Sequence, residues 1–143
     1  AHWPAGITTK PGFIYREPCH LIDLVPTFMQ VAGKKAKYPA NIPALDGVSL
    51  MSTFRGSTLQ RKKPLFFQYG SWQVIREKQW KLVQRQSDPW QLYNLAEDRT
   101  EIRDLAATMP ERVVQMKTQW QEWAKEVDIK VRSNRKLKKK PGK

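Results

Sequence analysis

Residues 64–95 read PLFFQYGSWQVIREKQWKLVQRQSDPWQLYNL. Four short runs rich in β-branched and aromatic residues follow one another there: Leu65–Tyr69, Trp72–Arg76, Trp80–Gln84 and Trp90–Asn94. Runs that recur at roughly eight to ten residues predict an antiparallel meander of four strands. We expect a tight hairpin around Glu77-Lys78, although neither residue favours the positive φ angle that such turns require.

A long amphipathic helix is expected after this sheet. From Pro110 onward, apolar residues recur at spacings of three and four, at Val113, Met116, Trp120, Trp123 and Val127. Two stretches, 98–101 and 108–111, fit the capping box that begins a helix. We expect Trp120 and Trp123 to be buried against the sheet. The fold class is therefore α+β, a small antiparallel sheet of about four strands packed against a long C-terminal helix.

The segment before the sheet predicts a shorter helix. Apolar residues follow helical spacing between Cys19 and Gly33, with Asp23 as the N-cap and Gly33 at the position that stops a helix. Residues 14–16 are expected to form a short strand. A connecting loop region, 34–63, contains a short helix or turn at Leu50–Arg55 that Gly56 would end.

The charge is unevenly distributed along the 143 residues. The formal net charge is +13, but the last fourteen residues carry eight basic side chains and no acidic one, which leaves +5 for residues 1–129. A like-charged block of this kind is typical of a solvated, disordered tail. The alternative is an anchor for a polyanion such as nucleic acid, sulfated glycan or anionic lipid.

Few catalytic or metal-binding patterns are compatible with the sequence. No apolar run approaches the about 18 residues of a transmembrane helix, and a single cysteine, Cys19, excludes Cys-rich metal sites. No phosphate-binding glycine loop or Gly-x-Ser-x-Gly elbow is present. Cys19 precedes His20, but a sequence neighbour is rarely the partner of a nucleophile. The residues alone indicate a fold, with His20 as the one candidate for a binding role.

Several local patterns, in their order along the chain, resemble the C-terminal portion of type I sulfatases. They are HLIDLVPT at 20–27, Ala32-Gly33, LDGVSL at 45–50, Val74–Arg76, WKLV at 80–83, WQLYNL at 90–95, DRTE at 98–101 and Asp104–Ala106. The resemblance covers about residues 1–127. It implies the alkaline-phosphatase-like superfamily, with sulfuric ester hydrolysis of the arylsulfatase type in the intact enzyme. The family usually has Gly where Lys78 stands and often Pro where Arg99 stands.

The resemblance places the reacting groups outside this chain. Family members use a formylglycine, made within a Cys/Ser-x-Pro/Ala-x-Arg motif, and a calcium ion held by Asp and Asn side chains. Both lie N-terminal to the matched region, and Cys19 is followed by His20-Leu21-Ile22, which does not fit the motif. We therefore expect no catalytic residue, metal ligand or cofactor in this chain, which alone should be inactive. His20 remains the candidate for substrate binding.

The resemblance also implies an organisation and a set of partners. Residues 1–33 are expected to be a remnant of the large catalytic α/β domain, 34–63 a connecting region, 64–129 the C-terminal α+β subdomain, and 130–143 a disordered basic tail. The expected partner is the missing N-terminal catalytic region of the same protein. A homo-oligomer through exposed apolar residues of the first 33 is also expected. The intact protein would be periplasmic, secreted or lysosomal. The alternative function is a polyanion-binding module for nucleic acid or sulfated glycan.

Overall fold

The chain folds into two compact units. A computed structural model describes residues 1–33, 38–39 and 41–129, so the basic tail at 130–143 lies outside the described residues. We call Ala1–Lys63 the N-terminal unit and Pro64–Lys143 the C-terminal unit. Within the described residues, no helix is long and apolar enough to cross a membrane.

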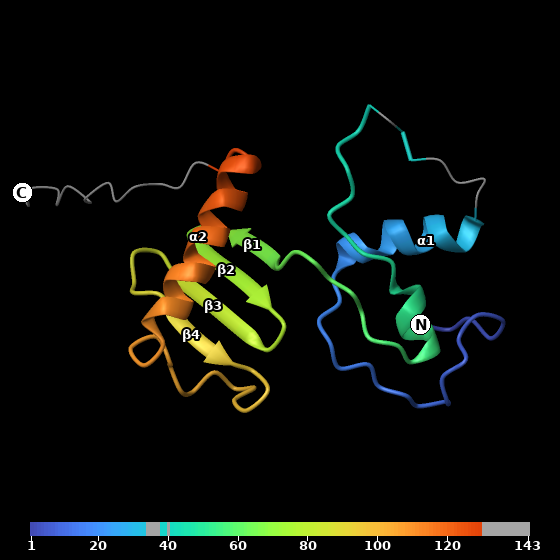
Figure 1. The fold of residues 1–143 in the computed structure, drawn as a ribbon, viewed down its shortest axis with the longest axis horizontal. Coiled ribbons are helices and arrows are strands. Elements are labelled where there is room, and N and C mark those ends of the chain that lie inside the picture. The colour runs from blue at the N-terminus through green and yellow to red at the C-terminus, as the bar shows by residue number, and fades with distance from the viewer. Residues whose placement is uncertain (34–37, 40, 130–143) are drawn as a thin grey trace, which may run out of the picture. The chain divides into compact units, whose positions relative to one another are not determined.

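The C-terminal unit contains the predicted four-stranded antiparallel sheet. Its strands are β1 (Leu65–Tyr69), β2 (Trp72–Glu77), β3 (Trp80–Arg85) and β4 (Gln91–Asn94). They lie side by side in chain order, each paired with the next (Figure 1). The four runs of the sequence are confirmed to within a residue at each end, because short apolar runs separated by turn residues have few other ways to satisfy their backbone hydrogen bonds.

The β2–β3 turn lies one residue later than expected. Glu77 pairs with Trp80, so the two-residue turn is Lys78-Gln79. Lys78 has a φ angle of 50°, a backbone conformation that costs a residue with a Cβ about 1–2 kcal/mol. Glycine, the residue that the resemblance implies at this position, would avoid that cost.

The long helix is α2 (Pro110–Glu126), with proline in its first turn and Met109 at the N-cap. No side chain caps it, since the N-cap residue is a methionine, and the Thr108 hydroxyl donates to the carbonyl of Leu105. The expected capping box at 108–111 is therefore wrong, although the helix begins where predicted. No helix begins at 98–101 either: the Asp98 carboxylate accepts from the backbone of Arg103 and closes a loop.

The core of the C-terminal unit lies between α2 and one face of the sheet, and Figure 1 shows α2 lying across the strands. Six buried side chains form it: Ile75, Leu82, Leu92, Met116, Trp120 and Ala124. Trp120 is 1% exposed, as predicted. Trp123 is half-buried and stacks on Phe66 with ring centroids 5.1 Å apart. The expected inward position of Val127 is wrong, since this side chain is 45% exposed beyond the last residue of the helix.

The N-terminal unit has little regular structure. It contains a 3₁₀ turn, η1 (Leu21–Asp23), the helix α1 (Leu24–Ala32) and a second 3₁₀ helix, η3 (Leu50–Arg55). Gly33 and Gly56 follow α1 and η3 with φ angles of 72° and 77°, which confirms both as helix ends. The strand expected at 14–16 is wrong. The Tyr15 hydroxyl there accepts the backbone N–H of Leu59 at 2.7 Å.

Candidate functional site

A buried carboxylate organises the N-terminal unit. Asp23, which is fully buried, ends η1 and immediately precedes α1. Its Oδ2 accepts the backbone N–H of His20 at 2.8 Å and the guanidinium of Arg61 at 2.5 Å. Its Oδ1 accepts the backbone N–H of Val48 at 2.9 Å. Three segments of the chain therefore meet at one side chain. Asp23 lies at the N-cap position of α1, as predicted, but its carboxylate closes the capping box of η1 and does not cap α1.

The electrostatics of Asp23 favour the ionised form. Burial by itself would raise the pKa of this carboxyl, but the N–H groups of Val48 and His20 and the Arg61 guanidinium together lower the pKa below its usual value. Arg61 is mostly buried as well, with a side chain 14% exposed. The pair is therefore charged at neutral pH, and its charges are balanced within the unit.

Thr27 and Gly47 complete the same contact. The Thr27 hydroxyl donates to the carbonyl of Asp23 at 2.5 Å and accepts the backbone N–H of Leu50 at 2.9 Å. A Cβ on Gly47 would lie 2.0 Å from the carbonyl oxygen of Ile22, so only glycine fits this close approach of two backbones. The two sequence patterns HLIDLVPT and LDGVSL are thus two halves of one contact, which we call the Asp23 clamp (Asp23, Thr27, Gly47 and Arg61).

His20, the predicted binding residue, lies at the edge of the clamp. Its backbone N–H reaches Asp23, and its ring Nδ1 accepts the backbone N–H of Ile22 at 3.2 Å. A nitrogen that accepts is unprotonated, so in the neutral ring Nε2 carries the proton. The ring is half-buried. The structure therefore gives His20 a local role as the cap of η1.

Cys19 is exposed, and its thiol lies 3.7 Å from the carbonyl oxygen of Glu17. Partial desolvation of the sulfur and, next, the charge of Asp23 raise the pKa of the thiol. A raised pKa lowers the thiolate fraction, and the thiolate is the nucleophilic form. The chemistry of this position does not favour a nucleophile.

The donor set around Asp23 does not fit a calcium ion. Calcium takes six to eight oxygen ligands, whereas the Asp23 oxygens face N–H groups and a guanidinium. Across the described ranges, no three His, Cys, Asp or Glu side chains are placed to share a metal ion.

Sequence reasoning missed Arg61 and Thr27 as members of the clamp. Arg61 stands next to two lysines in a stretch predicted as a connecting loop, and nothing local distinguishes it from them. Asp23 itself could have indicated a missing partner, because a carboxylate within an apolar helical pattern needs a cationic or N–H partner when it is buried.

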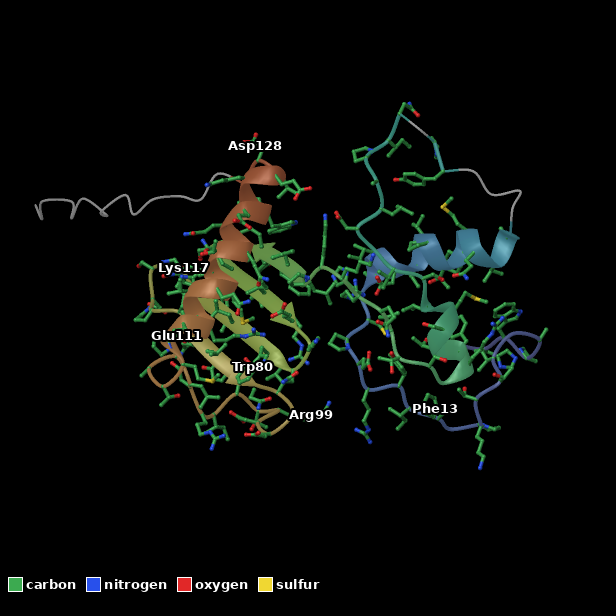
Figure 2. The ribbon with its side chains drawn as sticks, in the orientation of Figure 1. Phe13, Trp80, Arg99, Glu111, Lys117 and Asp128 are labelled. Atoms are coloured by element: carbon green, nitrogen blue, oxygen red, sulfur yellow. The ribbon has the colours of Figure 1, made fainter. Side chains whose placement is uncertain are left out.

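The C-terminal unit carries its charged groups on partly exposed surfaces. Lys81 donates to both oxygens of Glu101 at 2.6 Å. Arg112, in the first turns of α2, donates to Glu77 at 2.6 Å and lies over the ring of Trp80, which Figure 2 labels at the start of β3. These pairs join the hairpin to the segments that follow it in the chain.

Comparison with known proteins gives the chain its family. No family model matches it. A choline-sulfatase of Rhizobium meliloti is 32% identical over 108 residues, covering 71% of this chain and 20% of the relative. A sulfatase of Formosa agariphila is 28% identical over 121 residues, covering 73% of this chain and 22% of the relative. The chain belongs to the sulfatase family. It spans about a fifth of the length of these curated relatives.

Solved structures share the fold. The crystal structure of Ps i-CgsB in complex with k-i-k-neocarrahexaose aligns with 27% identity and a TM-score of 0.60, covering 71% of this chain and 23% of that one. The structure of BT4656 in complex with D-glucosamine-2-N,6-O-disulfate aligns at 20% identity with a TM-score of 0.54, a likeness of fold. The predicted resemblance to a portion of the sulfatases is confirmed.

Proposed function

We propose that this sulfatase chain is the C-terminal part of a sulfuric ester hydrolase and contributes architecture and cleft lining rather than reacting groups. The observation that supports this most directly is the Asp23 clamp. The best-buried carboxylate among the described residues has both oxygens bound by donors of its own unit, so it stabilises a fold and is not available as a base or ligand. Calcium and formylglycine would belong to the catalytic region of the longer enzyme.

Turnover measurements test this proposal. The purified chain, with added calcium, should hydrolyse neither an aryl sulfate nor choline sulfate above the buffer rate. Cys19→Ala and His20→Ala serve as matched variants, since these side chains are the two candidates for chemistry. Calcium-dependent turnover that either substitution abolishes would overturn the assignment of the chain as non-catalytic.

The proposed partner is the catalytic region of the same polypeptide, and the proposed contact is the apolar surface of η1 and α1. This surface consists of Leu21, Leu24, Val25, Phe28 and Val31, whose side chains are 40–78% exposed. Monomeric proteins seldom leave contiguous apolar surface of this kind in water. Since the relatives are about five times longer than the matched region, the remaining sulfatase chain is the occupant that we propose.

Cysteine labelling distinguishes the occupants of this surface. In a Cys19→Ser background, Phe28→Cys should react quickly in the isolated chain and slowly in a polypeptide that joins the chain to a sulfatase catalytic region. Val114→Cys is the matched control, because Val114 is 63% exposed on α2 and should react quickly in both. Equal rates at Phe28→Cys would refute the docking proposal. Protection in the isolated chain that disappears on dilution would identify a second copy as the occupant, which is the predicted homo-oligomer.

His20 is the side chain that we propose for substrate contact in the longer enzyme. An imidazole ring can donate an N–H to a sulfate or sugar oxygen. His20→Ala in that enzyme should raise KM for the sulfate ester with little change in kcat, whereas a purely capping role predicts a lower melting temperature and an unchanged KM. A role of the basic tail toward polyanions stays a prediction, because residues 130–143 lie outside the described part of the chain.

A further inference from the structure

Three side chains form a row across one end of the sheet. Tyr69 ends β1 and pairs with Trp72, which begins β2 and pairs with Arg85 at the end of β3. Directly paired residues of antiparallel strands point to the same face. Ile75, three positions after Trp72, belongs to the core under α2. Since side chains alternate along a strand, the row lies on the face opposite α2.

The row is exposed to water. Tyr69 is 85% exposed and Trp72 is 42% exposed, and the Arg85 side chain is exposed as well. The Arg85 guanidinium lies 5.2 Å from the centroid of the Trp72 ring. This cation–π contact holds a flat aromatic surface beside a positive charge. Hairpin pairing explains why the residues are neighbours, but it does not require an aromatic side chain as open to solvent as Tyr69.

Arg85 differs from three other cations of the C-terminal unit, whereas Arg76, which also has no ion pair among the described residues, donates to the carbonyl of Gln79. Lys81, Arg103 and Arg112 each form an ion pair with a glutamate. Among the described residues, no carboxylate forms an ion pair with Arg85. Its guanidinium is therefore held in place by Trp72 while its donors keep their capacity for an anion, and a guanidinium fork matches the oxygens of a planar or tetrahedral anion.

We propose that Tyr69, Trp72 and Arg85 form a binding site for a sulfated sugar. The apolar face of a pyranose ring stacks on an exposed aromatic ring, and the Arg85 guanidinium donates to the sulfate oxygens of the same or the adjoining sugar. The choice of sulfate among anions rests on the proposed function. The site itself is a binding surface and requires no turnover.

Binding by the full 143-residue chain tests this site. The probes are a chondroitin 6-sulfate hexasaccharide and the unsulfated chondroitin hexasaccharide, which keeps the carboxylates, measured by isothermal titration calorimetry. Tyr69→Ala, Trp72→Ala and Arg85→Gln should each weaken binding of the sulfated probe by roughly tenfold, the loss expected for one charge-assisted or stacking contact. Arg85→Lys should lose most of that affinity, because lysine keeps the charge without the fork.

Matched controls separate this site from the basic tail. Phe13→Ala removes an exposed aromatic ring, 52% exposed, in the N-terminal unit, and Arg99→Gln removes an exposed cation on the loop after β4, labelled in Figure 2. Neither control should change the affinity. Binding that is equal for both probes, or insensitive to the three site substitutions, refutes the proposal; in the second case the basic tail or another surface is the binding element.

Two further results keep the proposal testable if a variant does not fold and separate it from the proposed function. If Trp72→Ala or Arg85→Gln does not fold, Tyr69→Ala decides, since a side chain that is 85% exposed contributes little to folding. Site-specific binding without sulfatase activity in any longer protein carrying the chain would refute the proposed function and leave this site intact. Sulfatase activity in the longer protein, together with no effect of the three substitutions on sugar binding, would refute this site and leave the proposed function intact.

Discussion

The two units are stabilised in opposite ways. The C-terminal unit holds an apolar core in which Trp120, Ile75 and Met116 are almost fully buried. In the N-terminal unit the best-buried side chains are Asp23 and Thr27, while large apolar residues such as Leu21 and Phe28 are 78% and 64% exposed. Apolar burial is non-directional and tolerant, whereas a buried ion pair is stabilising only while every partner is present.

From this difference we expect the C-terminal unit to be stable by itself and the N-terminal unit to need a further contact. An apolar core between a sheet and a helix is the usual basis of an independently stable domain. The Asp23 clamp fixes the backbone of the N-terminal unit, but the large apolar side chains of that unit stay exposed to water. The sulfatase relatives, about five times longer than the matched region, provide the context in which that surface would be covered.

Separating the units should produce the largest effect. Residues 64–143 expressed alone should fold cooperatively, because the core residues all come from this unit. Residues 1–63 alone should lack a cooperative transition, since hydrogen bonds rather than buried apolar area hold them together. Circular dichroism and thermal melting of both pieces measure this. A cooperative melt of 1–63, or an unfolded 64–143, would invalidate the contrast between the units.

Truncating a core side chain of the C-terminal unit should produce the second-largest effect. Trp120→Ala removes the largest buried side chain and the hydrogen bond from its Nε1 to the Phe67 carbonyl at 3.4 Å. The expected loss in the free energy of unfolding of the C-terminal unit is about 3–5 kcal/mol. Val114→Ala on the exposed side of the same helix should change it by less than about 0.5 kcal/mol. Denaturant unfolding followed by circular dichroism gives both values; wild-type stability in Trp120→Ala is incompatible with the core described above.

Breaking the Asp23 clamp should destabilise the N-terminal unit and leave the C-terminal unit unchanged. Asp23→Ala leaves the mostly buried Arg61 and two backbone N–H groups without an acceptor, which should cost about 3 kcal/mol. Amide hydrogen exchange should rise at α1 and at residues 48–50 and stay unchanged in β1–β4. Asp46→Ala is the control, because its ion pair with Lys63 is exposed and such pairs contribute little. Equal exchange in both variants would show that the clamp is not what orders this unit.

Acid should reveal the same difference between the units. The folded-state pKa of Asp23 lies below its unfolded value, so its contribution to stability is complete above the unfolded pKa of about 3.9 and is lost as pH falls through the folded value. The protection factors of the α1 amides, which correct for the pH dependence of the intrinsic exchange rate, should therefore fall in acid. Asp23→Asn should remove most of this dependence, while the melting of the C-terminal unit changes less with pH. Identical acid profiles for α1 in the wild type and Asp23→Asn would contradict the linkage.

The smallest expected effect lies in the β2–β3 turn. Lys78→Gly should stabilise the C-terminal unit by up to about 1 kcal/mol, because a φ angle of 50° costs lysine more than glycine. Lys78→Ala removes the same charge but keeps the Cβ, so it should give no comparable gain. Thermal melting of the two variants compares them directly, and an equal gain in both would assign the effect to charge instead of backbone conformation.

The sequence by itself determined the four strands, the start of α2, the two glycine helix ends and the family, because each depends on local spacing of apolar and turn residues. It misplaced features that depend on neighbours: the caps at 98–101 and 108–111, the strand at 14–16 and the inward position of Val127. Only the tertiary structure decided that Arg61 pairs with Asp23 across 38 residues and that Trp72 and Arg85 meet on the face opposite the core. Such pairs form where folding brings distant segments together, and no local pattern distinguishes Arg61 from the lysines beside it.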